Sequence, residues 1–154
     1  MEGAKTGGTP NFPAVASVAK RGDLKVEIGG GIRNDDTVAK YLDAGVERVI
    51  LGTAALKDRP FLERMLARYA AHIAVGVDCR NGLVATHGWT ETSETTCEEF
   101  CASLQSLGVQ TIIVTDISRD GAMRGTNRGL YGAILGKAYY TGAVDLRDAL
   151  EAAK

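Results

Sequence analysis

The residues that could do chemistry stand in short polar or glycine-rich groups, and each group directly follows an apolar stretch. Asp78 follows residues 73–77, and Thr115 follows residues 111–114. A carboxyl group at such a position can act as a general acid or base. The other groups of this kind are Gly29-Gly30-Gly31, Gly52-Thr53, Thr115-Asp116 and Gly136-Lys137.

Short apolar stretches alternate with amphipathic helical patterns along the chain. Continuous apolar strands separated by helices indicate an α/β fold with a parallel sheet covered on its faces. Active-site groups in such folds lie at the carboxyl ends of the strands, so the groups above are expected on one edge. The predicted strands are 26–28, 48–51, 73–77, 111–114 and 133–135. Four helices are predicted: one that starts at Asn34 or Asp35, one over about 59–69, one over about 95–107, and one that starts near Asp145. Residues 81–92 are predicted to form a hairpin.

Composition narrows the possible partners and compartment. We expect one domain, residues 1–154, because this is the ordinary size of a single domain. The net charge is −1 with both signs mixed throughout, which indicates neither nucleic acid nor a membrane surface as a partner. The longest apolar runs have the length of strands, and the first residues show no basic-then-apolar signal pattern. We therefore expect a cytoplasmic protein.

Cysteine and histidine offer little for metal chemistry. The three cysteines show no metal-ligand spacing, and there are only two histidines. Cys97 and Cys101 are four residues apart on a predicted helix, where we expect them to be small buried apolar groups. We expect neither a metal site nor a cofactor.

Two internal echoes indicate a repeat with a shortened second half. MEGAKTGGTPN at the start resembles RDGAMRGTN near residue 120, and RVILGTAALKD resembles GAILGKAYYTG. Gly3 and Gly121 are 118 residues apart, whereas Gly52 and Gly136 are 84 apart. The mismatch of 34 residues predicts that a helix, a strand and a helix are missing near residues 126–131.

Six motifs in this order resemble the ProFAR isomerase family of histidine biosynthesis, across nearly the whole chain. They are VEIGGGIR, VILGTAAL, AVGVD, GW, VTDISRDG and AILGKA. The family's fold is a (βα)8 barrel. Its reaction is an Amadori rearrangement of a phosphoribosyl-formimino aminoimidazole carboxamide nucleotide (ProFAR), in which a general acid opens a ribose ring and a base moves a proton.

Compared with the family pattern, the chain lacks several elements. By family position the chain keeps strands three, four, five, six and eight, and the two echoes are the loops after strands two and six. The strand with an early catalytic aspartate and the seventh strand with its phosphate loop have no counterpart, and Glu2 stands where an aspartate is usual. We expect a partial barrel of about five parallel strands, completed by self-association as a homodimer or higher homo-oligomer, because open edges favour aggregation.

The resemblance assigns the site residue by residue. Asp120 matches the general acid, Asp78 a polar active-site residue and Thr115 a threonine that contacts substrate. Trp89 matches an aromatic residue that stacks on the substrate. From the residues alone, Asp120 could be a turn aspartate before glycine, Thr115 a strand-end cap, and Trp89 a packing residue.

The family's substrate carries two phosphates, and exposed backbone N–H groups of glycine loops can approach their oxygens. The residues that match the first phosphate site are Gly30, Gly31, Gly52 and Thr53; Gly136 and Lys137 match part of the second. Arg33 either adds charge nearby or is a solvated arginine at a helix start. Tight strand-to-helix turns would explain the same glycines.

Three hypotheses follow. The first is an isomerase whose site is shared between subunits, so that the partner's copy of Asp78 replaces the lost base opposite Asp120. The second is an inactive phosphate-binding partial barrel, and the third is a folded but functionless deletion product. Barrels that isomerise phosphoribosylanthranilate or form imidazole glycerol phosphate share the two phosphate sites, and only the GW and SRDG details favour ProFAR isomerase.

Overall fold

The computed structural model describes residues 8–117. Contacts divide the chain into two compact units, Met1–Thr115 and Asp116–Lys154, and nearly all described residues lie in the first. The helices are α2 (Phe12–Ala19), α3 (Asp35–Asp43), α4 (Thr53–Lys57), α5 (Arg59–Tyr69), the 3-10 turn η1 (Ala70–His72) and α6 (Cys97–Ser106). The strands are β1 (Glu27–Gly29), β2 (Arg48–Leu51), β3 (Ile73–Arg80), β4 (Leu83–Thr86), β5 (Glu91–Thr96) and β6 (Ile112–Asp116).

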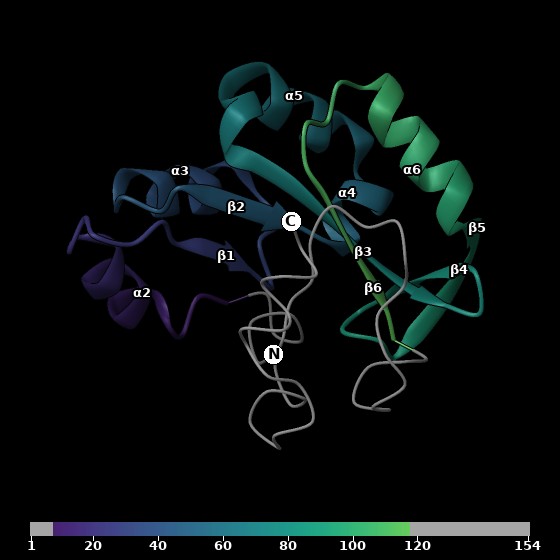
Figure 1. The fold of residues 1–154 in the computed structure, drawn as a ribbon, viewed down its shortest axis with the longest axis horizontal. Coiled ribbons are helices and arrows are strands. Elements are labelled where there is room, and N and C mark those ends of the chain that lie inside the picture. Colours follow the sequence, from purple (N-terminus) through teal and green to yellow (C-terminus); the bar gives the residue numbers. More distant parts are fainter. Residues whose placement is uncertain (1–7, 118–154) are drawn as a thin grey trace, which may run out of the picture. The chain divides into compact units, whose positions relative to one another are not determined.

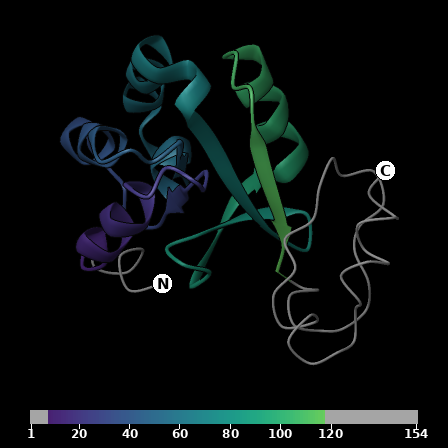
Figure 2. The same ribbon diagram turned by 60° about the vertical axis from the view of Figure 1, so that its left-hand side comes forward.

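The six strands form one mixed sheet in the order β1-β2-β3-β4-β5, with β6 on β3 (Figure 1). β1, β2 and β3 are parallel, and Val49 lies opposite Ile73. β3, β4 and β5 are antiparallel neighbours. β6 runs in the same direction as β3 in Figures 1 and 2. The sheet is therefore α/β in its β1, β2, β3 and β6 part, with a hairpin excursion inserted.

Helices α3, α5 and α6 pack on one face of this sheet, as Figure 2 shows. Every second residue of β2 and β3 points to them, so Val49, Leu51, Val75 and Val77 are fully buried. The helices contribute Phe61, Leu62, Met65, Phe100 and Leu104 to the same core. The helix-covered face is thus the hydrophobic core of the described part.

Local signals explain where these helices begin. The side chain of Asn34 accepts a hydrogen bond from the Thr37 N–H at 2.9 Å, which caps α3. Thr96 and Glu99 form a capping box at the start of α6. Gly45 has φ +92° just after α3, a left-handed conformation that glycine adopts without strain. These caps fix the ends of the helices that cover the strands.

The opposite face of the same strands carries small and charged residues. Glu27 lies opposite Arg48, and their Oε1 and Nη1 atoms are 2.6 Å apart. Ile50 lies beside Gly29 on the neighbouring strand, and a Cβ on Gly29 would come within 3.1 Å of the Ile50 Cβ. A side chain at position 29 would therefore require the Ile50 side chain to shift.

The sequence prediction needs corrections within the described residues. β3 extends to Arg80 rather than ending before Asp78, because its pairing with β4 continues the strand beyond the apolar run. A short helix, α4, follows Gly52 directly. Strand 133–135 and the helix near Asp145 lie outside the described residues.

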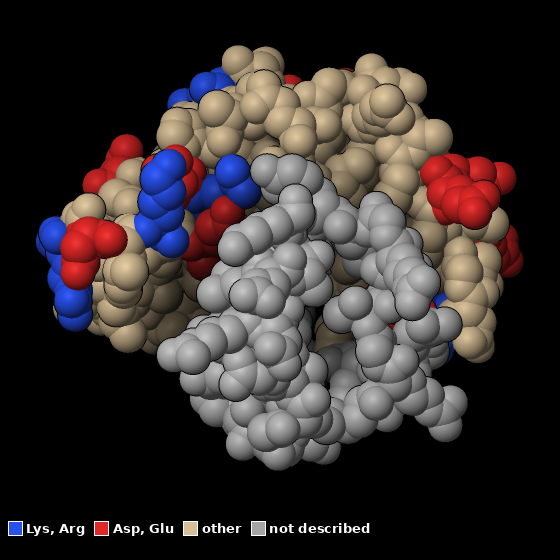
Figure 3. Space-filling view, viewed as in Figure 1, with Lys and Arg blue, Asp and Glu red and all other residues tan. Residues whose placement is uncertain are grey.

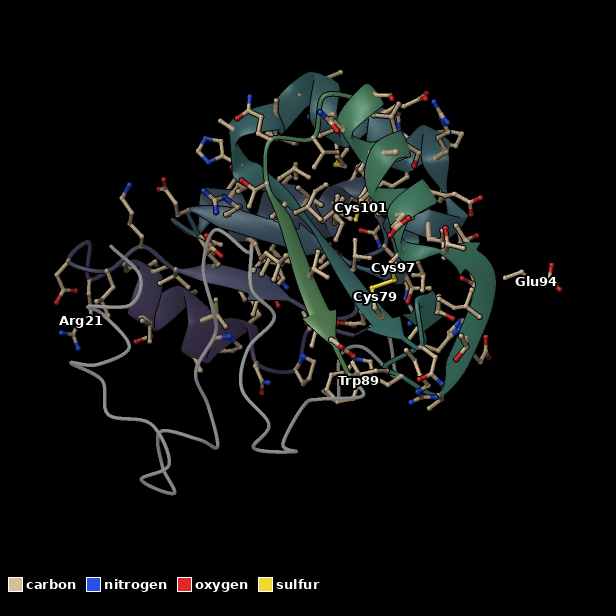
Figure 4. The ribbon with its side chains drawn as sticks, turned by 45° about the vertical axis from the view of Figure 1, so that its right-hand side comes forward. Arg21, Cys79, Trp89, Glu94, Cys97 and Cys101 are labelled. Carbon is tan, nitrogen blue, oxygen red and sulfur yellow. A yellow bond between two sulfur atoms is a disulfide. The ribbon has the colours of Figure 1, made fainter. Side chains whose placement is uncertain are left out.

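The prediction that Cys97 and Cys101 are small buried apolar groups needs correction, because both are only half-buried and Cys97 is disulfide-bonded. Cys97, the first residue of α6, forms a disulfide with Cys79 of β3 (Figure 4). Cys101 is free and half-buried, and burial raises the pKa of its thiol. Within residues 8–117, no helix combines the length and the apolar character needed to cross a bilayer.

Charged side chains on the face drawn in Figure 3 do not form one basic patch. Lysine and arginine lie beside acidic side chains at one end. Acidic side chains gather at the end that carries β5 and α6, where Glu94 and Glu98 are exposed. The view agrees with the mixed charge of the sequence.

Candidate active site

The carboxyl ends of β1 and β2, together with Asp78 in β3, bring the predicted residues of three segments to one edge of the sheet. Parallel pairing places Gly29 beside Ile50, so the loops Gly30–Gly31 and Gly52–Thr53 leave neighbouring strands in the same direction. A small depression at this edge brings Thr53 and Asp78 together. It is lined by Gly52, Thr53, Leu56, Gly76, Asp78, Val84, Ala85, Thr86, Gly88 and Phe100.

Asp78 is half-buried and belongs to the face of β3 that points away from the helices, as do Ala74 and Gly76. The Val75 N–H donates to the Thr111 carbonyl at 3.0 Å. In a parallel ladder this bond places Val75 opposite Ile112, and the same register places Asp78 opposite Thr115. A carboxyl group and a hydroxyl therefore lie on adjacent strands and on the same face.

The two glycine loops differ in backbone conformation. Gly30 and Gly31 have φ values of +105° and +77°, in a region that other residues adopt only with strain. Gly52 has φ −104°, and a Cβ at this position would meet no atom within 4 Å. Gly30 and Gly31 are therefore required by the turn itself, whereas the space beside Gly52 is open.

Trp89 lies in the turn between β4 and β5, where His87, Gly88 and Trp89 all have positive φ. We name residues 87–89 the Trp89 turn. The His87 N–H donates to Thr53 Oγ1 at 3.1 Å, which ties this turn to the loop after β2. Figure 4 shows Trp89 on the side of the sheet where β6 ends. The predicted aromatic residue therefore lies on the same edge as Asp78.

Near the first glycine loop, an acidic and a basic side chain form an ion pair on the surface. Asp35, at the start of α3, contacts Arg64 of α5 at 3.1 Å. The hydrogen bond from Arg64 lowers the pKa of the Asp35 carboxyl below its ordinary value. Arg33 is exposed in the loop between Gly31 and α3.

Three predicted residues, Asp120, Gly136 and Lys137, lie outside the described residues. The structure adds two residues that sequence reasoning missed. Thr86 is buried at 4% exposure and lines the depression. Arg80 donates from Nη2 to the Trp89 carbonyl at 3.0 Å. Only the GW motif pointed to this region, and it says nothing of what holds the tryptophan.

Comparisons with known proteins identify relatives of the whole chain. Residues 1–144 match the family described as histidine biosynthesis protein. A protein of Brachyspira hyodysenteriae is 42% identical over 186 aligned positions, which cover 100% of this chain and 78% of the relative. One of Oceanobacillus iheyensis is 40% identical over 183 positions, covering 98% and 76%. One of Bacillus subtilis is 39% identical over 189 positions, covering 100% and 77%.

All three relatives carry the name 1-(5-phosphoribosyl)-5-((5-phosphoribosylamino)methylideneamino)imidazole-4-carboxamide isomerase. The alignment with the Brachyspira protein has 186 positions, whereas this chain has 154 residues. At least 32 positions of that alignment therefore have no residue in this chain. This agrees with the 34 residues by which the internal echoes differ.

Proposed function

The chain belongs to the histidine biosynthesis protein family, and from that premise we propose that it is an isomerase that converts ProFAR to its ribulosyl form by an Amadori rearrangement. The observation that carries the proposal is the position of Asp78. Asp78 lines a depression together with Gly52 and Thr53, in a chain about 40% identical to named isomerases.

The chemistry needs two carboxyl groups on opposite sides of the sugar, one protonated and one ionised. We assign the general acid to Asp120 and the second carboxyl group to Asp78. Thr115, opposite Asp78 in the inferred register, contacts the substrate hydroxyls. Trp89 stacks on a planar part of the substrate.

Two phosphate groups fix the substrate at its ends. The backbone N–H groups of Gly30, Gly31 and Gly52 and the hydroxyl of Thr53 bind the first phosphate. Gly136 and Lys137 contribute to the second. No step of this proposal is assigned to a metal or a cofactor.

The chain acts as a partial (βα)8 barrel that self-association completes, as a homodimer or a higher homo-oligomer. Two observations support this proposal. At least 32 positions of the alignment with the Brachyspira protein have no residue here. Within residues 8–117, β6 pairs with β3 and no pairing joins it to β1, so these strands do not form a closed barrel. We expect this assembly in the cytoplasm, with a small bis-phosphorylated substrate and with neither nucleic acid nor membrane as a partner.

Isomerase turnover of the purified chain on ProFAR, measured across a dilution series, tests the proposal. Turnover per chain that falls on dilution supports a site completed between chains. Turnover that is constant on dilution supports the isomerase and contradicts the shared site. Binding of inorganic phosphate without turnover at any concentration would favour the inactive phosphate-binding alternative.

A further inference from the structure

The Trp89 turn is held in a conformation that its residues do not favour. His87 and Trp89 have φ values of +52° and +74°, with Gly88 at +64° between them. Left-handed backbone is uncommon for residues with a Cβ and is strained for a bulky one. Such a conformation persists only where the surroundings over-determine it, and it occurs often at functional sites.

Two side chains from other elements hold this turn by its main chain. Thr53 of α4 accepts from the His87 N–H at 3.1 Å, and Arg80 of β3 donates to the Trp89 carbonyl at 3.0 Å. The Thr90 hydroxyl adds a local bond by donating to the His87 carbonyl at 2.9 Å. The first and last residues of the turn are therefore each fixed by one distant side chain.

Other polar side chains beside the turn do not replace these bonds. His87 Nδ1 lies 2.8 Å from Glu91 Oε2, and Lys57 Nζ lies 3.9 Å from the same oxygen. Nδ1 nevertheless has no aligned hydrogen bond within the described residues. The side chains of Lys57 and Glu91 are 54% and 60% exposed, so solvent weakens their attraction. The bonds to Thr53 and Arg80 remain the defined anchors.

We propose that Thr53 and Arg80 are positioning residues that set the direction of the Trp89 indole over the substrate. The inference rests on the proposed function for its substrate, but its structural content concerns the free protein. Arg80 acts through Trp89, since its guanidinium bonds to the carbonyl of that residue. Thr53 acts through His87, at the other end of the same turn.

Thr53 additionally links the turn to the first phosphate. A hydroxyl group has one donor and two acceptor positions. Its oxygen can therefore accept from the His87 N–H while its own proton is donated to a phosphate oxygen. Occupation of the Gly52–Thr53 loop by phosphate is then transmitted to Trp89 through one side chain.

Fluorescence reads this turn directly, because Trp89 is the single tryptophan of the chain. We expect Arg80→Met to raise acrylamide quenching of Trp89 about twofold, because the released turn samples more open conformations. Arg80→Lys, which keeps one cationic donor, should restore most of the parent value. Arg21→Met is the matched control, since Arg21 is exposed, pairs with Asp23 and lies far from Trp89 in Figure 4.

Turnover separates positioning from a general structural role. Weaker stacking affects the bound substrate and the transition state alike, so Arg80→Met should raise KM about tenfold with kcat within about twofold. Its affinity for inorganic phosphate should equal that of the parent. A loss of kcat and of phosphate affinity together would show general damage and would overturn the assignment of Arg80.

Inorganic phosphate tests the Thr53 link. Phosphate should change the Trp89 emission of the parent and of Thr53→Ser, which keeps the hydroxyl group, but not of Thr53→Val. Unchanged quenching in folded Arg80→Met, or an equal phosphate response in Thr53→Val, would overturn the inference. Absence of turnover in the parent would count against the proposed function alone, because the fluorescence results stand without substrate.

Discussion

The helix-covered face of the sheet and its carboxyl-terminal edge differ in burial, polarity and backbone conformation. On the covered face, Leu51, Val75 and Val77 are fully buried among the side chains of α5 and α6. At the edge, Gly52 is exposed, Asp78 is half-buried, and the Trp89 turn has three positive φ values in a row. The face contributes stability through burial, while the edge presents polar groups and strained backbone for binding.

This contrast predicts that mutations in the two regions have separate consequences. Substitutions on the covered face should lower the free energy of unfolding and leave phosphate affinity unchanged in the folded fraction. Substitutions in the glycine loops of the edge should weaken phosphate binding, in addition to any cost in stability. The predictions below test this separation, from the largest expected change in stability to the smallest.

Leu62→Ala should cost about 2–5 kcal/mol of unfolding free energy, because it leaves a cavity in a buried site. Leu62 is 1% exposed. Leu24→Ala is the control with the same chemical change at a residue that is 56% exposed, and it should stay within about 0.5 kcal/mol of the parent. Urea unfolding measures both, and equal midpoints for the two variants would contradict the position of the core.

Reduction of the disulfide between Cys79 and Cys97 should cost about 3 kcal/mol, from the closure entropy of an 18-residue separation. This bond crosses the boundary between the two regions, because Cys79 follows Asp78 and Cys97 starts α6. Unfolding with and without a dithiol reductant measures the cost. Cys101→Ser should leave the reductant effect intact, and three free thiols in the untreated protein would contradict the pairing.

Gly30→Ala should cost about 1–2 kcal/mol, since alanine is strained at positive φ. Gly82→Ala in the turn between β3 and β4 should cost a similar amount, because Gly82 has φ +81°. Only Gly30→Ala should weaken the binding of inorganic phosphate, as titration calorimetry can measure. Equal phosphate affinity in both variants would remove Gly30 from the proposed phosphate site.

The smallest effect concerns pH and the pair of Asp35 and Arg64. The pKa of Asp35 is lowered in the folded protein, so its contribution to stability is present above the unfolded pKa and is lost as pH falls through the folded value. The window therefore lies below about pH 4. Thermal unfolding of the parent and Asp35→Asn should converge there. A difference that grows on acidification would contradict this sign.

The apolar pattern predicts the covered face well. Residues 48–51 and 59–69 form β2 and α5 as predicted, and Asn34 caps α3. The hairpin predicted over residues 81–92 forms, but its second strand, β5, continues to Thr96 and so passes the predicted start of the next helix at residue 95. These elements follow from periodicity and capping, which are local properties of the sequence. The coarser prediction of an α/β sheet is confirmed for the described residues.

The edge was predictable only in part. Asp78 and Thr53 stand out in the sequence by residue type. The depression that they share is also lined by residues of β4, and the pairing of β4 with the end of β3 was not visible in the sequence. The bond of Cys79 with Cys97 joins residues on two elements, and no spacing rule reveals it. The anchor of Arg80 depends on the left-handed backbone of Trp89, which sequence patterns do not show.

The most direct test of the account is the turnover of ProFAR by Asp78→Asn, with Asp23→Asn as the exposed control. The account predicts that Asp78→Asn lowers kcat/KM by about a hundredfold or more and leaves the unfolding temperature near that of the parent. Asp23→Asn should match the parent in both. Turnover by Asp78→Asn at the parent's rate would contradict the claim that this edge of the sheet is the active site.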